Sequence, residues 1–106
     1  MPITVVKKDK SRESFDRNKV LNSIIRACDK RLVTRGEMDS VVSSIEMQLQ
    51  NSLQTEIPSS RIGEMVMERL KDVDEVAYVR FASVYRQFKD IDAFMDELNR
   101  LLAEKK

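Results

Sequence analysis

A chain of 106 residues, 42% hydrophobic and 35% charged, is long enough for one domain with a modest core, and no apolar run reaches the roughly 20 residues of a membrane span. Its net charge of +1 argues against binding of DNA or RNA by this chain alone, because such binding usually requires a strongly basic face. One cysteine and no histidine exclude an internal disulfide, a zinc site and a catalytic triad built on histidine.

Positive charge gathers near the N-terminus. Residues 1–36 carry ten basic and four acidic side chains, a local charge of +6 in a chain of net charge +1. The chain begins with MPITVVKKDK, which lacks the apolar region of a signal peptide, so we expect a cytoplasmic location. A basic N-terminal part on a mildly acidic remainder suggests a site for a small polyanion.

Two short extended runs at residues 3–6 and 12–15 predict a β-hairpin, with its tip at Asp9-Lys10 or Lys10-Ser11. No glycine is present there to take a positive φ, so the turn is a type I variant or is longer than two residues. A hairpin alone is marginal in water. The strands must therefore lie on helices, or pair with another strand that the sequence does not show clearly.

Asp16 is a suitable N-cap for a first helix of about 15 residues. Cys28 lies on its apolar stripe, and we expect a buried core thiol because a nucleophile would lack a histidine partner. Lys19 lies in the first turn, where the positive end of the helix dipole disfavours a cation. An anionic ligand at this helix start would remove the conflict, and the alternative is a solvated lysine that tolerates the position.

A capping box of Thr34 and Glu37 opens a second helix, whose apolar stripe loosens into a loop over residues 48–55. A third helix is predicted from about residue 58 to residue 71. Gly63 lies in its first turn, where glycine costs roughly 1 kcal/mol relative to alanine. We therefore expect a close approach to this backbone, either by another helix or by a ligand ring.

A fourth helix, capped by Asp74, is predicted over residues 75–88, and a fifth over about 90–104. The fourth carries four of the six aromatic residues of the chain on one broad face. Aromatic residues at this spacing form either core or a ligand platform, and tyrosine hydroxyls need partners when they are buried.

The pattern as a whole predicts a mostly α (α+β) fold, a bundle of four or five helices capped by a short N-terminal β-hairpin lid. We expect one domain over residues 1–106, with the hairpin at 3–15 and the helical body at 16–104.

Both glycine-rich phosphate loops are excluded, because the chain has only two glycines. Phosphate binding must then use Lys7, Lys8 and Lys19, together with the free N–H groups at the starts of the first and third helices. Adjacent strand residues point to opposite faces, so Lys7 and Lys8 do not both face the helices unless the turn twists one around. The sequence presents no pair of inward carboxylates, metal cluster or activated nucleophile, and we expect a binding module and not an enzyme.

Several segments, in order, resemble a known family. VVKKD at residues 5–9 and FDRNKV at 15–20 resemble the ATP-cone, a nucleotide-binding regulatory domain of many ribonucleotide reductases and of the NrdR family of bacterial repressors. VAYVRFASVYRQFKD at residues 76–90 is similar to the NrdR version in particular. IPSSRIG at 57–63 and RACDKR at 26–31 fit the same family, so the resemblance covers nearly the whole chain.

The resemblance implies a domain that binds ATP or dATP as an effector between the hairpin lid and the helices. In NrdR the nucleotide changes self-association, which controls repression of ribonucleotide reductase genes. The first strand and its turn would line the nucleotide, the second strand would contact it, and the first helix turn would bind phosphate. The residues so implied are Val5, Lys7 and Lys8, then Glu13, then Lys19, with Tyr78, Phe81 and Tyr85 as further candidates for contact with base, sugar or a second nucleotide.

The chain departs from the family pattern in three ways. The motif usually has arginine where this chain has Lys8 and glycine where it has Lys10, which adds charge but removes a bidentate guanidinium. NrdR proteins begin with a four-cysteine zinc ribbon that reads DNA, whereas this chain starts just before the lid, either as a shortened form or as a natural protein without the ribbon. We therefore expect no zinc site, partners that are adenine nucleotides and its own kind, and DNA binding only with a separate ribbon.

Two alternatives to this function are open at this point. One is a helical protein-interaction module that docks a partner without nucleotide, and the other is an ATP-cone that regulates a ribonucleotide reductase directly. The first would use adaptable methionine-rich faces, and the second would share the nucleotide site. The methionines concerned are Met38, Met47, Met65, Met67 and Met95.

Overall fold

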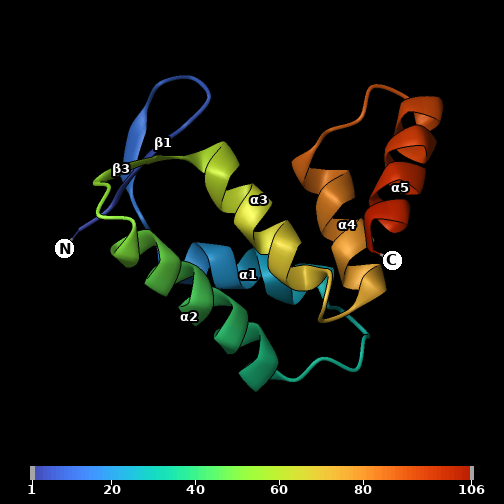
Figure 1. Ribbon diagram of the computed structural model, residues 1–106, viewed down its shortest axis with the longest axis horizontal. Coiled ribbons are helices and arrows are strands. Elements are labelled where there is room, and N and C mark those ends of the chain that lie inside the picture. Colours follow the sequence, from blue (N-terminus) through green and yellow to red (C-terminus); the bar gives the residue numbers. More distant parts are fainter. Residues whose placement is uncertain (1, 106) are drawn as a thin grey trace.

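The computed structural model describes residues 2–105, which form five helices and one three-stranded sheet (Figure 1). The elements are β1 (Thr4–Val6), β2 (Arg12–Ser14), α1 (Arg17–Ala27), α2 (Arg35–Asn51), β3 (Glu56–Pro58), α3 (Ser59–Leu70), α4 (Glu75–Tyr85) and α5 (Ile91–Lys105). The sheet and the hairpin turn lie next to the start of α3, and α5 stands beside α4 at the opposite side of the molecule (Figure 1). The predicted mostly α fold with a short N-terminal hairpin is confirmed.

The sheet has β1 at its centre, in the order β2-β1-β3. β1 pairs antiparallel with β2, with Val5 opposite Glu13, as the hairpin prediction requires. It also pairs in parallel with β3, with Val5 opposite Ile57. β3 had no strand signal of its own, because Ile57 is a single apolar residue between Glu56 and Pro58. It supplies the further pairing strand that the hairpin left open.

The hairpin turn contains a left-handed residue that is not glycine. The Lys10 N–H donates to the Lys7 carbonyl at 2.9 Å, and the Lys7 N–H donates to the Ser11 carbonyl at 2.8 Å. These bonds define a three-residue loop in which Lys10 takes a φ of 74°, so the turn is longer than two residues, as expected. Asp9 accepts bonds from the Ser11 hydroxyl at 2.6 Å and the Ser11 N–H at 2.9 Å, which lower the pKa of its carboxyl.

Three helices begin at the caps that the sequence predicts. Asp16 accepts a bond of 3.0 Å from an N–H in the first turn of α1. Thr34 and Glu37 form the capping box of α2. Asp74 accepts a bond of 3.0 Å from the first turn of α4. These polar side chains replace hydrogen bonds that a helix start cannot make internally.

The helix ends were less predictable than the starts. α1 has 11 residues and not about 15, α2 continues to Asn51 in the predicted loop, and α4 ends at Tyr85, before its predicted end. Each of these helices is followed within three residues by a non-glycine residue of positive φ, which ends right-handed helical geometry. The three residues are Lys30, Leu53 and Gln87.

The core lies among α1, α2, α3 and α4 and the side of the sheet that faces them. β1 and β3 contribute Val5 and Ile57, which are 6% and 1% exposed. Cys28 is buried with them, and burial raises the pKa of its thiol, so the predicted core role is confirmed. The largest fully buried side chains are Tyr78, Ile24, Ile45, Ile57, Leu70, Val42 and Val66.

α5 is attached mainly at its C-terminal half. In the described part of this helix, Leu101 is the one buried hydrophobic residue. Arg86, just after α4, forms ion pairs with Glu64 of α3 and Glu97 of α5, and Arg100 also pairs with Glu97. These pairs are partly exposed, so they orient the helix more than they stabilise it.

Candidate functional site

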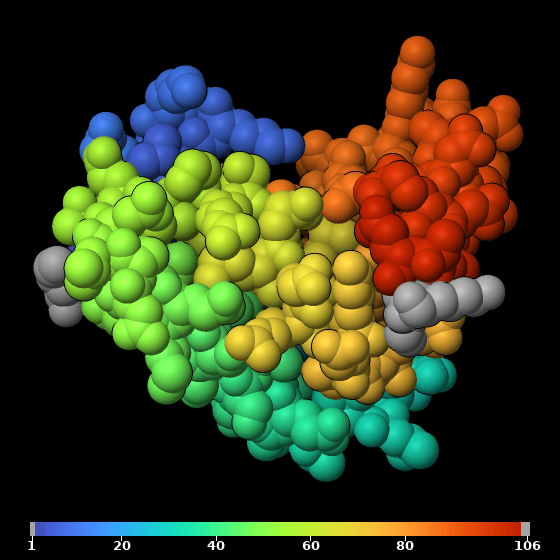
Figure 2. Space-filling view, viewed as in Figure 1, coloured from blue at the N-terminus to red at the C-terminus, as the bar shows by residue number. Residues whose placement is uncertain are grey.

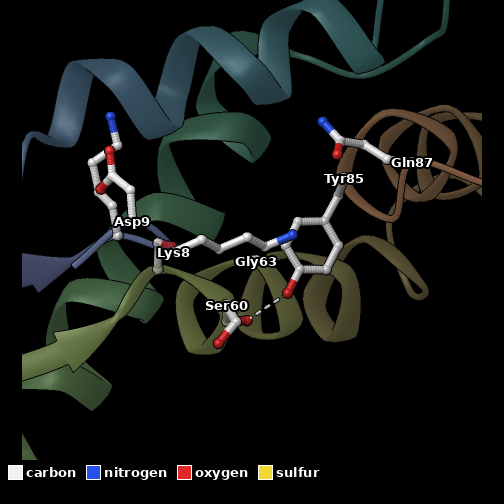
Figure 3. A pocket seen from close by; sticks show the side chains of 8 residues that line it. Lys8, Asp9, Ser60, Gly63, Tyr85 and Gln87 are labelled. Atoms are coloured by element: carbon white, nitrogen blue, oxygen red, sulfur yellow. Dashed lines mark hydrogen bonds between the residues drawn. The ribbon is translucent and has the colours of Figure 1, made fainter. Parts of the chain in front are cut away.

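A cavity of about 460 Å³ lies between the hairpin turn, the start of α3 and the end of α4 (Figure 3). We call it the hairpin cavity. In the space-filling view a hollow separates the hairpin from the segment that joins α4 to α5 (Figure 2). The residues that line the cavity are Lys7, Lys8, Asp9, Ser59, Ser60, Gly63, Tyr85 and Gln87.

The parallel pairing of β1 with β3 brings the two sides of this cavity together. Val6, the last residue of β1, is opposite Pro58, the last residue of β3. Parallel strands end at the same edge of a sheet. Lys7 and Lys8, which follow β1, therefore lie beside Ser59, which begins α3, and the Lys8 side chain extends along α3 toward Tyr85 (Figure 3).

The start of α3 has no side-chain cap. Its N-cap residue is Pro58, which makes no capping hydrogen bond, whereas a side chain accepts an N–H at the start of each of the other four helices. The first N–H groups of a helix have no partner inside the helix, and the helix dipole makes this end positive. With Lys7 and Lys8 close by, the start of α3 is a favourable place for an anion.

A second, smaller cavity of about 130 Å³ lies under the strands, and we call it the strand cavity. Ser59 lines both cavities, so they meet at the start of α3. In the strand cavity the Lys19 ammonium donates to Glu13 Oε1 at 2.9 Å, and this bond lowers the pKa of the Glu13 carboxyl. The lining residues are Val5, Glu13, Ser14, Phe15, Asp16, Lys19, Val20, Ser59 and Ile62.

Glu13 partly compensates the unfavourable position of the Lys19 cation in the first turn of α1. The first turn of α1 contains no acidic residue, so the helix itself offers Lys19 no compensation. Glu13 provides a negative charge from the neighbouring strand β2. Both side chains are well exposed, at 62% for Lys19 and 38% for Glu13, so this pair is weak and the ammonium is accessible to a competing anion.

Tyr85 closes the hairpin cavity from the side of α4. Its hydroxyl donates to the Ser60 carbonyl at 2.7 Å, and its ring lies against Gly63 (Figure 3). A Cβ at Gly63 would lie 2.7 Å from Cδ1 of Tyr85 and closer still to other ring atoms, so only glycine fits. The close approach expected at Gly63 is therefore a contact between two helices, and burial raises the pKa of the Tyr85 hydroxyl.

Six of the eight residues singled out in the sequence line one of the two cavities. Phe81 instead stacks against Tyr85, with ring centroids 5.9 Å apart, and faces a groove between α1 and α4. Tyr78 has no exposed surface and lies in the core, away from both cavities. The six lining residues are Val5, Lys7, Lys8, Glu13, Lys19 and Tyr85.

Asp9 and Gln87 are among the lining residues of the hairpin cavity that were not singled out as site residues. Asp9 carries a signal, because it belongs to the VVKKD motif and hydrogen-bonds within the turn. Gln87 carries none, since its place in the cavity follows from its φ of 48°, which ends α4 and turns the chain. Within residues 2–105 no group of three or more Cys, Asp or Glu side chains is arranged to hold a metal ion. No helix of that part is both long and apolar enough to cross a membrane.

The family profile and the similar proteins all point to the same family. A profile described as "ATP cone domain" matches residues 3–91. A protein of Acetivibrio thermocellus named "Transcriptional repressor NrdR" is 64% identical over 105 residues, which cover 99% of this chain and 70% of the relative. Proteins of the same name from Caldicellulosiruptor bescii and Clostridium acetobutylicum are 61% and 54% identical, over 98% and 99% of this chain and 68% and 70% of their own lengths.

Proposed function

The chain belongs to the ATP-cone family and, within it, to the NrdR transcriptional repressors, and from this premise we propose that it binds ATP or dATP as an effector and so regulates a repressor of ribonucleotide reductase genes. Its relatives are named as repressors, which supports a regulatory role and not an enzymatic one. A bacterial transcription regulator acts where the chromosome is, so we also propose a cytoplasmic location.

The hairpin cavity is the observation that carries the proposal. Its volume of about 460 Å³ falls within the roughly 300–1,000 Å³ range of small-molecule sites. Lys7, Lys8 and the uncapped start of α3 are suited to a polyphosphate, and Tyr85 offers an aromatic ring to a base or sugar. In the proposed complex Lys19 leaves Glu13 and contacts phosphate, while Val5 and Glu13 line the strand cavity.

Calorimetric titration with ATP and dATP tests nucleotide binding. We expect saturable heat with each nucleotide and competition between the two for the same site. Absence of heat at millimolar concentrations of both nucleotides would contradict the proposal.

The Lys19→Ala substitution tests the phosphate contact. We expect triphosphate affinity to fall about tenfold, which corresponds to about 1.4 kcal/mol, while adenosine affinity stays close to that of the unchanged protein. Arg35→Ala is the matched control, because Arg35 is an exposed cation at the start of α2, away from the hairpin (Figure 1). Equal loss of triphosphate and adenosine affinity in Lys19→Ala would mean that Lys19 has a structural role only.

We further propose that the chain forms homo-oligomers through this domain and that the nucleotide changes their size. The chain spans about 70% of the length of its curated relatives. DNA binding, which a repressor requires, is proposed to need a zinc ribbon separate from residues 1–106.

The methionine-based alternative has little support. Met65 and Met67 are buried, at 6% and 3% exposed, and so offer no adaptable surface. Met47 and Met95 are exposed, but they lie on α2 and α5, which are not neighbours in Figure 1. Direct regulation of a reductase would use the same nucleotide site, and the names of the relatives favour the repressor.

A further inference from the structure

A groove of about 510 Å³ lies between α1 and α4, outside the two cavities described above. We call it the α1–α4 groove. Val84, on the last turn of α4, is 77% exposed within it, and the partly buried ring of Phe81 lies one turn earlier. The lining residues are Ser23, Arg26, Ala27, Arg80, Phe81, Ser83, Val84 and Tyr85.

Two arginines line the groove, and they differ in whether their guanidinium groups have hydrogen-bond partners. Arg80 already donates to the carbonyls of Ala27 and Asp29, at 3.3 and 2.6 Å, and so joins α4 to the end of α1. Arg26 is exposed, and within residues 2–105 its guanidinium makes no hydrogen bond or ion pair. An apolar floor with a free guanidinium beside it is suited to an apolar partner that also carries carboxylates.

The first half of α5 has the complementary surface. Ile91 and Met95 are 77% and 44% exposed and lie one helical turn apart. Asp92 and Asp96 follow them with the same spacing, and within the described chain their carboxylates have no cationic partner. The ion pairs of α5 are instead made by Glu97 and residues beyond it. This half of α5 is therefore an acidic amphipathic surface without a partner.

We propose that the first half of α5 from one copy of the chain docks in the α1–α4 groove of a second copy. Ile91 and Met95 would cover Phe81 and Val84, and Asp92 or Asp96 would pair with Arg26. Each copy carries both surfaces, and in a two-fold dimer the contact would be made twice. This inference rests on the self-association proposed above and identifies the surfaces that carry it.

Tyr85 provides a physical link between the groove and the nucleotide site. It is the one residue that lines both the hairpin cavity and the α1–α4 groove, and it stacks against Phe81 in the groove. A nucleotide that displaces the Tyr85 ring from Gly63 changes the shape of the groove floor. Docking and nucleotide binding are then coupled, and each affects the equilibrium of the other.

Exchange of charges between the two surfaces tests the proposal. The mass of the protein is measured by sedimentation without nucleotide, with ATP and with dATP, and variants are compared in the condition that gives the largest mass. We expect Arg26→Glu, and separately the pair Asp92→Lys and Asp96→Lys, to weaken self-association about tenfold or more. The protein that carries all three substitutions should return to within about threefold of the original affinity.

Misfolding could explain a loss of self-association in Arg26→Glu or in the double aspartate variant. It could not explain recovery of self-association when all three substitutions are combined. Val84→Asp should also weaken self-association, whereas Met47→Asp, on an exposed position of α2, should not. Loss in Arg26→Glu without recovery in the triple variant would overturn the proposed contact. A mass that is monomeric in all three conditions would also overturn it.

Nucleotide calorimetry on the same variants separates this proposal from the proposed function. If Arg26→Glu binds nucleotide with unchanged heat but fails to associate, the docking surface is supported independently of the nucleotide site. If the unchanged protein binds nucleotide and never associates, the docking proposal fails and nucleotide binding stands. If it associates, responds to the charge exchange and binds no nucleotide, the docking surface stands without the nucleotide site.

Discussion

Lys10 occupies a backbone conformation that glycine adopts at much lower cost. Its φ of 74° places it in the left-handed region, which costs an L-residue roughly 1–2 kcal/mol. Glycine at this position avoids that strain but gains freedom in the unfolded chain, worth about 0.4–1 kcal/mol in the opposite direction. The first effect exceeds the second, so glycine is expected to be the more stable residue here.

Lys10→Gly should therefore raise the free energy of unfolding by about 0.5–1 kcal/mol. Lys10→Ala is the control, because it removes the charge and keeps the Cβ, and it should give no such gain. Urea unfolding of both variants measures the difference. A gain of equal size in Lys10→Ala would show that charge repulsion within the hairpin, and not backbone strain, is the cause.

The two tyrosines of α4 differ in what their hydroxyls contact. The Tyr85 hydroxyl donates to the Ser60 carbonyl at 2.7 Å. The Tyr78 hydroxyl is buried and has no hydrogen-bond partner among residues 2–105, and burial raises its pKa. A buried polar group without a partner destabilises the folded state, whereas a hydrogen-bonded one contributes to stability.

Substitution of each tyrosine by phenylalanine should have opposite effects. Tyr85→Phe should lower the free energy of unfolding by about 1 kcal/mol, because the bond to Ser60 is lost. Tyr78→Phe should leave it unchanged or raise it by up to about 1 kcal/mol. Thermal and urea unfolding measure both. A large loss in Tyr78→Phe would reveal a partner for its hydroxyl.

At the scale of elements, the start of α4 is held by the contacts of its N-cap residue, Asp74. Arg31 donates to the Asp74 carboxylate at 2.9 Å, and the same carboxylate accepts the Ala77 N–H at 3.0 Å. These two bonds, that of Arg31 first, lower the pKa of Asp74 below its ordinary value of 3.8. One side chain thus caps α4 and ties it to the loop after α1.

Asp74→Ala should lower the free energy of unfolding at pH 7 by about 0.5–2 kcal/mol, the usual effect of losing an N-cap. Because the folded-state pKa of Asp74 is depressed, its contribution is present above pH 3.8 and is lost as the pH falls through that depressed value. The difference between the two proteins should therefore shrink in acid. Urea unfolding between pH 7 and pH 2 measures this, and a difference that does not change with pH would contradict the assignment.

Among the helices of the described chain, α5 has the fewest buried residues, with Leu101 as its one buried hydrophobic residue. Helices held by little apolar burial open locally without global unfolding. Amide hydrogen exchange should therefore be at least about tenfold faster in the first half of α5 than in α3, which buries six residues. Equal protection of the two helices in the monomer would show that α5 opens only when the whole domain unfolds.

Across the whole molecule, features that depend on residues close together in the sequence were predicted well, and features that depend on distant residues were not. The caps at Asp16, Thr34 and Asp74 lie within a few residues of the N–H groups that they satisfy, so the sequence shows them directly. β3 is stabilised by β1, about fifty residues earlier, and its own three residues carry little strand preference. The left-handed residues that end α1, α2 and α4 are lysine, leucine and glutamine, which give no turn signal.

The candidate site follows the same division. The charged residues of the hairpin were visible because positive charge gathers in residues 1–36. Lys19 was visible because its charge conflicts with its position in the first turn of a helix. That Lys7 and Lys8 meet the start of α3 depends on the parallel pairing of β1 with β3, which no local pattern predicts. Tyr78 and Tyr85 share one helix and similar surroundings in the sequence, and only packing places one in the core and the other over Gly63.

The parallel pairing of β1 with β3 also affects the order in which the site forms during synthesis. β1 and β2 leave the ribosome first, whereas β3, α3 and the end of α4 emerge much later. Until then Lys7 and Lys8 project from a hairpin that has no helix start beside it. A nascent chain therefore carries the basic turn without the cavity, and the proposed nucleotide site is incomplete until residues up to Gln87 have been translated.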